Sequence, residues 1–136
     1  MKLHHIIIGI ITTLSLTLFF SSTSLSMDDP GFIINRMIMC EDIADKEPVN
    51  ITDTFSADIE KVYCFFEAKE IENDTTVTFV WYFESKEMAR VSLPLTQGMR
   101  WRTFASKKLL GLNGHWKVEL QESSGIILNT VSFQVQ

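Results

Sequence analysis

The chain has 136 residues, of which 12 are Lys or Arg and 17 are Asp or Glu, so its formal net charge is −5 at pH 7. A hydrophobic fraction of 46% and a charged fraction of 21% are ordinary for a globular domain and exclude a disordered, collagen-like or coiled-coil chain. The acidic balance also argues against a nucleic-acid partner, since binding to phosphates requires a basic surface.

The N-terminus has the three-part layout of a secretory signal peptide. Lys2 supplies a positive charge, an apolar run extends over residues 6–20, and small polar residues follow. The small residue Ser26 predicts cleavage after position 26, which leaves a mature domain of residues 27–136. The alternative is an uncleaved membrane anchor, although a spanning helix needs roughly 20 apolar residues. We therefore expect a periplasmic or secreted protein without stable membrane insertion after cleavage.

The expected mature domain reads as a series of short strands. The apolar, β-branched and aromatic residues concentrate in seven segments, at 33–43, 59–68, 75–84, 88–95, 99–105, 115–121 and 126–135. This spacing predicts a single antiparallel β-sandwich, immunoglobulin-like or fibronectin-III-like, with a small barrel as the alternative.

The residues between these segments predict how the strands are joined. Pro48 predicts a loop at residues 46–50, and Pro94 predicts an edge position or a strand end. One helical turn is expected at residues 106–111, followed by a tight turn at Asn113-Gly114.

Cys40 and Cys64 both belong to the expected mature domain. Two thiols in an oxidising compartment usually pair, so we predict one intramolecular disulfide. Closing a loop of this size would stabilise the fold by roughly 3–4 kcal/mol. The alternative is a pair of buried thiols that pack as small hydrophobic side chains.

The first candidate binding surface lies on the strand expected at residues 99–105. Arg100 and Arg102 share one face of a pleated strand, and Trp101 points the other way. Two arginines on an acidic domain could form a fork for a carboxylate, a phosphate or an acidic partner, and Lys107 with Lys108 could enlarge it. The alternative is two solvated arginines beside a core tryptophan.

Aromatic residues supply the second candidate surface. A core position is the default for a tryptophan in the middle of a strand such as Trp116. The alternative is that Tyr82, Trp101 and Trp116 are exposed and that their rings stack on a glycan or cell-wall ligand. His115 is the only histidine of the expected mature domain, so we expect no metal site and no cofactor. The domain carries none of the common catalytic motifs. We therefore expect a non-catalytic binding or accessory module of the cell envelope, with another envelope protein as its partner.

The second half of the chain also carries an ordered series of short motifs. They are Val80-Trp81-Tyr82, Arg90-Val91-Ser92-Leu93, Arg100-Trp101-Arg102-Thr103, Ser106-Lys107, Gly114-His115-Trp116-Lys117-Val118, Gly125-Ile126-Ile127-Leu128 and Phe133-Gln134-Val135. Over roughly residues 77–136 this series resembles the bacterial domain of unknown function family 2914 (DUF 2914). Phe79 stands where the family pattern has a histidine. The resemblance implies a shared fold and no particular activity.

Overall fold

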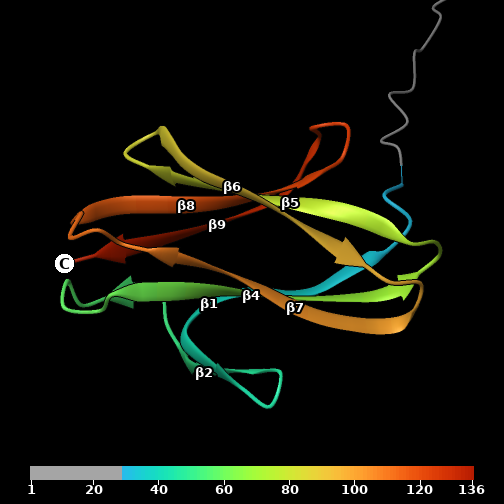
Figure 1. Ribbon diagram of the computed structural model, residues 1–136, viewed down its shortest axis with the longest axis horizontal. Helices are drawn as coiled ribbons and strands as arrows, with labels where there is room; N and C mark the ends of the chain where they lie inside the picture. The colour runs from blue at the N-terminus through green and yellow to red at the C-terminus, as the bar shows by residue number, and fades with distance from the viewer. Residues whose placement is uncertain (1–28) are drawn as a thin grey trace, which may run out of the picture.

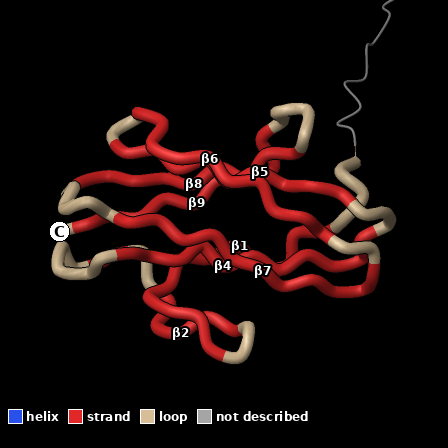
Figure 2. Tube along the Cα trace, in the orientation of Figure 1, coloured by secondary structure: helices blue, strands red, loops and turns tan. Residues whose placement is uncertain are grey.

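The computed structural model describes residues 29–136, so the predicted signal peptide at residues 1–26 lies outside the described residues. Within residues 29–136 the regular elements are all β-strands. None of this part forms a helix long and apolar enough to span a bilayer. Figure 1 shows the strands stacked in two layers, and Figure 2 shows that loops and turns join them.

The strands divide into two hydrogen-bonded sheets. In chain order they are β1 (Ile33–Ala44), β2 (Glu47–Ile51), β3 (Thr54–Phe55), β4 (Lys61–Ile71), β5 (Thr75–Phe83), β6 (Lys86–Leu95), β7 (Gly98–Lys108), β8 (Gly114–Glu122) and β9 (Ile127–Val135). The four-stranded sheet has the order β2-β1-β4-β7, and the five-stranded sheet has the order β3-β9-β8-β5-β6. The predicted all-β sandwich is confirmed, and the small-barrel alternative is wrong because the strands form two separate sheets rather than one closed sheet.

The core lies between the sheets, because alternate residues of each strand point inward. Its centre in the five-stranded sheet is aromatic. The ring of Phe133 stacks on Trp116 with centroids 5.9 Å apart, and it meets Trp81 edge-on at 6.1 Å. From the four-stranded sheet, Phe66 crosses the interior to contact Phe79 at 5.9 Å.

Three of the predicted connections are different in the structure. The expected loop at 46–50 is largely β2, where Pro48 pairs with Ile43; a proline is tolerated there because β2 is an edge strand. The expected helical turn is absent from the described chain because β7 continues to Lys108, and the chain turns at Leu110–Gly111 rather than at Asn113-Gly114. Pro94 does lie in an edge strand, β6.

The predicted disulfide does not form, because Cys40 and Cys64 are both free and buried. The β1–β4 register pairs Met39 with Cys64 and Cys40 with Tyr63, so the two cysteines are offset by one residue. Since side chains alternate across a sheet, Cys64 points into the core and Cys40 to the outer side, where its thiol donates to the Tyr63 carbonyl at 3.8 Å. Side chains on opposite faces cannot be bridged without backbone movement.

Burial also affects the chemistry of both thiols. It raises the pKa of Cys64, which is fully buried, and it raises the pKa of Cys40. The thiols therefore pack as small hydrophobic side chains, which is the alternative that the sequence left open.

Candidate functional site

The outer face of the four-stranded sheet gathers positive charge. Where β1, β4 and β7 are paired, the register places six cationic side chains on this face: Arg36, Lys61, Lys69, Arg100, Arg102 and Lys108. We call this surface the basic face. It holds half of the chain's 12 Lys and Arg residues, although the chain as a whole has a net charge of −5.

Like charges face each other at both ends of the β4–β7 ladder. Lys61 lies opposite Lys108, and Lys69 lies opposite Arg100. Like charges directly opposite each other in a sheet destabilise it. The basic face is therefore electrostatically unfavourable for the isolated fold, apart from its central part, where two carboxylates lie.

Two carboxylates and three arginines form the centre of the basic face, which we call the arginine network. The buried carboxylate of Glu67 accepts hydrogen bonds from Arg100 at 2.8 Å and Arg36 at 3.1 Å, and a further one from Asn35. The carboxylate of Glu47 accepts from Arg102 at 2.6 Å, Arg36 at 2.9 Å and Arg100 at 3.3 Å. Three guanidinium groups thus surround two carboxylates, which leaves one positive charge in excess.

The arginines change the titration of both carboxylates. Hydrogen bonds from Arg36 and Arg102 lower the pKa of Glu47 to about 2. Burial raises the pKa of Glu67, but hydrogen bonds from Arg36, Asn35 and Arg100 together outweigh burial and hold this pKa at about 2. Both carboxylates therefore stay ionised near neutral pH.

Glu47 reaches the network because the β1–β2 hairpin folds over the outer side of the sheet (Figure 1). Ala44 pairs with Glu47, so the hairpin loop consists of Asp45 and Lys46 alone. Both residues have positive φ, 51° and 59°, as a type I′ turn requires. This turn matches the twist of the strands and returns the chain so that Glu47 faces the arginines of β7.

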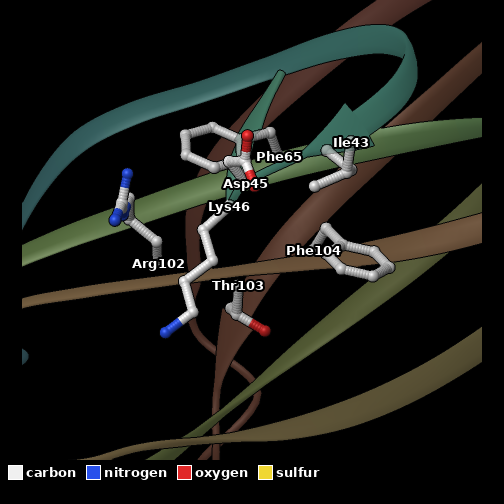
Figure 3. Close-up of a pocket in the computed structure, with 7 residues that line it drawn as sticks. All are labelled: Ile43, Asp45, Lys46, Phe65, Arg102, Thr103 and Phe104. Carbon is white, nitrogen blue, oxygen red and sulfur yellow. The ribbon is translucent and has the colours of Figure 1, made fainter. Parts of the chain in front are cut away.

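A groove of about 280 Å³ opens between the hairpin and the sheet. The residues that line it are Ile43, Asp45, Lys46, Phe65, Arg102, Thr103 and Phe104, and we call it the hairpin groove. Figure 3 shows the guanidinium of Arg102 on one side of it, and Ile43 and Phe104 on the other. Its lining combines apolar side chains with two cations, Lys46 and Arg102, and one carboxylate, Asp45, which suits an apolar group beside a polar or charged one.

The structure brings Arg100 and Arg102 together on one face, with side chains 50% and 24% exposed. Both are engaged by Glu47 or Glu67, two partners that were not among the predicted site residues. Lys107 does not enlarge this surface, because it has the opposite parity: its ammonium lies 5.8 Å from the centre of the Trp116 ring, and burial lowers its pKa. Lys108 does share the basic face.

The aromatic candidates lie elsewhere. Trp116 is fully buried and donates its indole N–H to the Leu112 carbonyl at 3.1 Å, so it has the core position that was its default, and the sugar-stacking alternative is wrong for this ring. Trp101 is half-buried against the core. Tyr82 is half-buried on the five-stranded sheet, with the ammonium of Lys117 4.8 Å from its ring centre. These three rings therefore do not form one platform.

Sequence reasoning missed Glu47, Glu67 and Phe104. A usable signal existed for Glu67, because it is a lone acid within the apolar run of residues 62–68 and must therefore be paired if buried. Glu47 carried no such signal, since it was assigned to a loop.

The segment from β5 to β9 is similar to a known protein family. Residues 74–135 match the model of the DUF2914 family, whose description is 'protein of unknown function'. The predicted resemblance to this family is confirmed. The DUF2914 match runs from β5 to β9, so it includes Arg100 and Arg102 but neither of the carboxylates that they bind.

Similar solved structures show a likeness of fold. An immunoglobulin-like protein from Pseudomonas aeruginosa is 12% identical, with 77% of this chain and 90% of that chain covered and a TM-score of 0.47. A β-glucosidase from Listeria innocua in complex with glucose is 8% identical, with 76% and 15% covered and a TM-score of 0.48. A β-glucosidase from Kluyveromyces marxianus is 16% identical, with 74% and 14% covered and a TM-score of 0.44. The chain thus spans only a small part of the β-glucosidases' length. No curated protein matches it.

Proposed function

We propose that this protein is a non-catalytic binding module of the cell envelope, and that its basic face meets an anionic surface of a partner protein. The observation that carries the proposal is the concentration of six cations on one face of an acidic chain. Glu47 and Glu67 offset part of this charge at the centre of the face, and Asp45 lies in the lining of the hairpin groove. A one-signed patch of this kind steers an oppositely charged partner and sets its orientation.

The like-charged pairs support the same proposal. Lys61 and Lys108 repel each other, whereas the repulsion between Lys69 and Arg100 is reduced because Glu67 and Glu47 bind Arg100. An anionic partner removes this repulsion on binding. Arrangements that destabilise the free protein and are relieved by a ligand are typical of functional surfaces.

The envelope location belongs to the proposal and rests on residues 1–26, with Lys2, the apolar run and the small residues before position 27. It is tested by N-terminal sequencing of the protein recovered from cell fractions. A chain that begins at Met27, in the periplasmic or secreted fraction, is the expected result. An intact N-terminus in the cytosol contradicts export.

The partner is tested by capture. The tagged full chain is expressed in its source cells, crosslinked and recovered at physiological and at high salt. Lys69→Glu with Lys108→Glu reverses two exposed cations of the basic face that lie outside the arginine network. Lys86→Glu with Arg90→Glu is the matched control, because it makes the same change in charge on β6 of the other sheet.

A defined protein that is recovered with the wild type and the control, lost with the basic-face variant and weakened by salt is the expected result. Equal recovery with the basic-face variant overturns the proposal. Recovery that disappears after nuclease treatment also overturns it, since the anionic surface is then a nucleic acid.

A further inference from the structure

We infer that the partner contributes an extended acidic segment that adds to the free edge of β7 as a new strand of the four-stranded sheet. The inference rests on the proposed function and names the occupant of the basic face. It follows from three features of β7: an open and regular edge, an alternating pattern of side chains, and charges that oppose pairing with a second copy.

The edge of β7 is open along its length. The strand has 11 residues, pairs with β4 without a register shift, and has no other strand beside it within residues 29–136. Other sheet edges carry structural protection: Pro94 in β6, Pro48 in β2, and only two residues in β3. Because an unpaired strand presents a row of free N–H and C=O groups, β7 is the edge best suited to accept another strand.

The outward side chains of β7 define what the new strand should carry. In order they are Arg100, Arg102, Phe104, Ser106 and Lys108. Residues directly opposite each other on neighbouring strands contact each other. An antiparallel segment therefore fits best with acids opposite the three cations and an aromatic residue opposite Phe104.

Phe104 is the apolar anchor of this pattern. Its side chain is 44% exposed in the middle of β7, and it lines the hairpin groove beside Phe65 and Ile43. The groove volume of about 280 Å³ falls just below the range of roughly 300–1,000 Å³ typical of small-molecule pockets. It therefore suits a single side chain of a bound segment better than a separate ligand.

Charge argues against a second copy of this chain as the added strand. Two β7 strands paired antiparallel about Phe104 would set Arg100 of each copy against Lys108 of the other. Pairing about Arg102 would set that arginine against itself. Such pairs are unfavourable, so these cations oppose pairing with a second copy in these two registers, while they favour an acidic strand.

The probe is the blocked peptide Glu-Thr-Thr-Val-Phe-Thr-Glu-Thr-Glu, whose residues run antiparallel to β7 from Lys108 to Arg100. It is titrated against the purified protein. Two further peptides carry N-methyl groups on alternate amides, so that one set removes donors that face β7 and the other removes donors that face away. A fourth peptide has Lys in place of each Glu.

The parent peptide and one N-methylated peptide should bind, while the other N-methylated peptide and the Lys peptide should not. Binding should protect β7 amides from hydrogen exchange, and Lys108→Glu should weaken it by about threefold or more, whereas Lys86→Glu should not. Equal binding of both N-methylated peptides, or no binding of the parent at millimolar concentration, overturns strand addition. The proposed function would still stand if capture depends on the basic face, so the two failures are distinguishable.

Discussion

Glu67 and Arg102 lie opposite each other in the β4–β7 ladder, yet each binds a different partner. The carboxylate of Glu67 is bound by Arg36 of β1 and Arg100 of β7, while Arg102 binds Glu47 of the folded-back hairpin at 2.6 Å. Because Arg102 of β7 binds Glu47 of β2, this ion pair connects the hairpin to the sheet. The same arginines therefore hold the fold together and supply part of the charge of the basic face.

Replacing Glu47 by Gln should loosen the hairpin without unfolding the sandwich. Its side chain is 41% exposed, so the loss of its charge should weaken the hairpin locally rather than destabilise the whole fold. Amide hydrogen exchange should therefore accelerate at residues 44–50 and change little in β8. Glu87→Gln, in the exposed pair with Arg90, is the control. Unchanged exchange in the hairpin would show that Glu47 does not hold it.

Acid should weaken the fold through Glu67. Its pKa is about 2 in the folded protein against an ordinary value of 4.5, so its ion pairs contribute stability that is complete above about pH 4.5 and is lost as the pH falls toward 2. Glu67→Gln should lower the free energy of unfolding by roughly 3 kcal/mol at pH 7. It should also flatten the decline between pH 4.5 and 2. Urea unfolding at several pH values measures both effects, and an unchanged slope in the variant contradicts this role for Glu67.

Cys40 and Cys64 should be free thiols that react only after unfolding. Both are buried, and burial raises the pKa of each, so little reactive thiolate forms in the native protein. Alkylation without reductant, followed by mass spectrometry, should give no modification in buffer and two modifications in denaturant. A mass two hydrogens lower that resists alkylation in denaturant would instead reveal a disulfide.

Phe133 should be among the side chains that contribute most to stability. It contacts Phe55, Trp81 and Trp116 with centroids 5.6, 6.1 and 5.9 Å away. Phe133→Ala should therefore cost about 3–5 kcal/mol in denaturant unfolding. Ile127→Ala in the same strand is the matched control, because Ile127 is 54% exposed, and its effect should stay within about 0.5 kcal/mol. Similar losses in the two variants would mean that the core is not centred on Phe133.

Several features followed from the sequence by itself because they depend on local alternation. The strands predicted at 75–84 and 115–121 are found at 75–83 and 114–122. These strands, the edge position of Pro94 and the shared face of Arg100 and Arg102 all arise from the period-two pattern of a pleated strand. The two-sheet architecture followed from the number and spacing of such strands.

Only the tertiary structure decided the pairings between distant strands. The β1–β4 register offsets Cys40 from Cys64 by one residue and so sends their side chains to opposite faces. Trp116 is buried because the other sheet covers its face. Glu47 and Glu67 meet Arg102 and Arg100 across 55 and 33 residues of chain because the strands that carry them pack together. Register and packing depend on contacts that are remote in the sequence, so no local pattern in either segment specifies them.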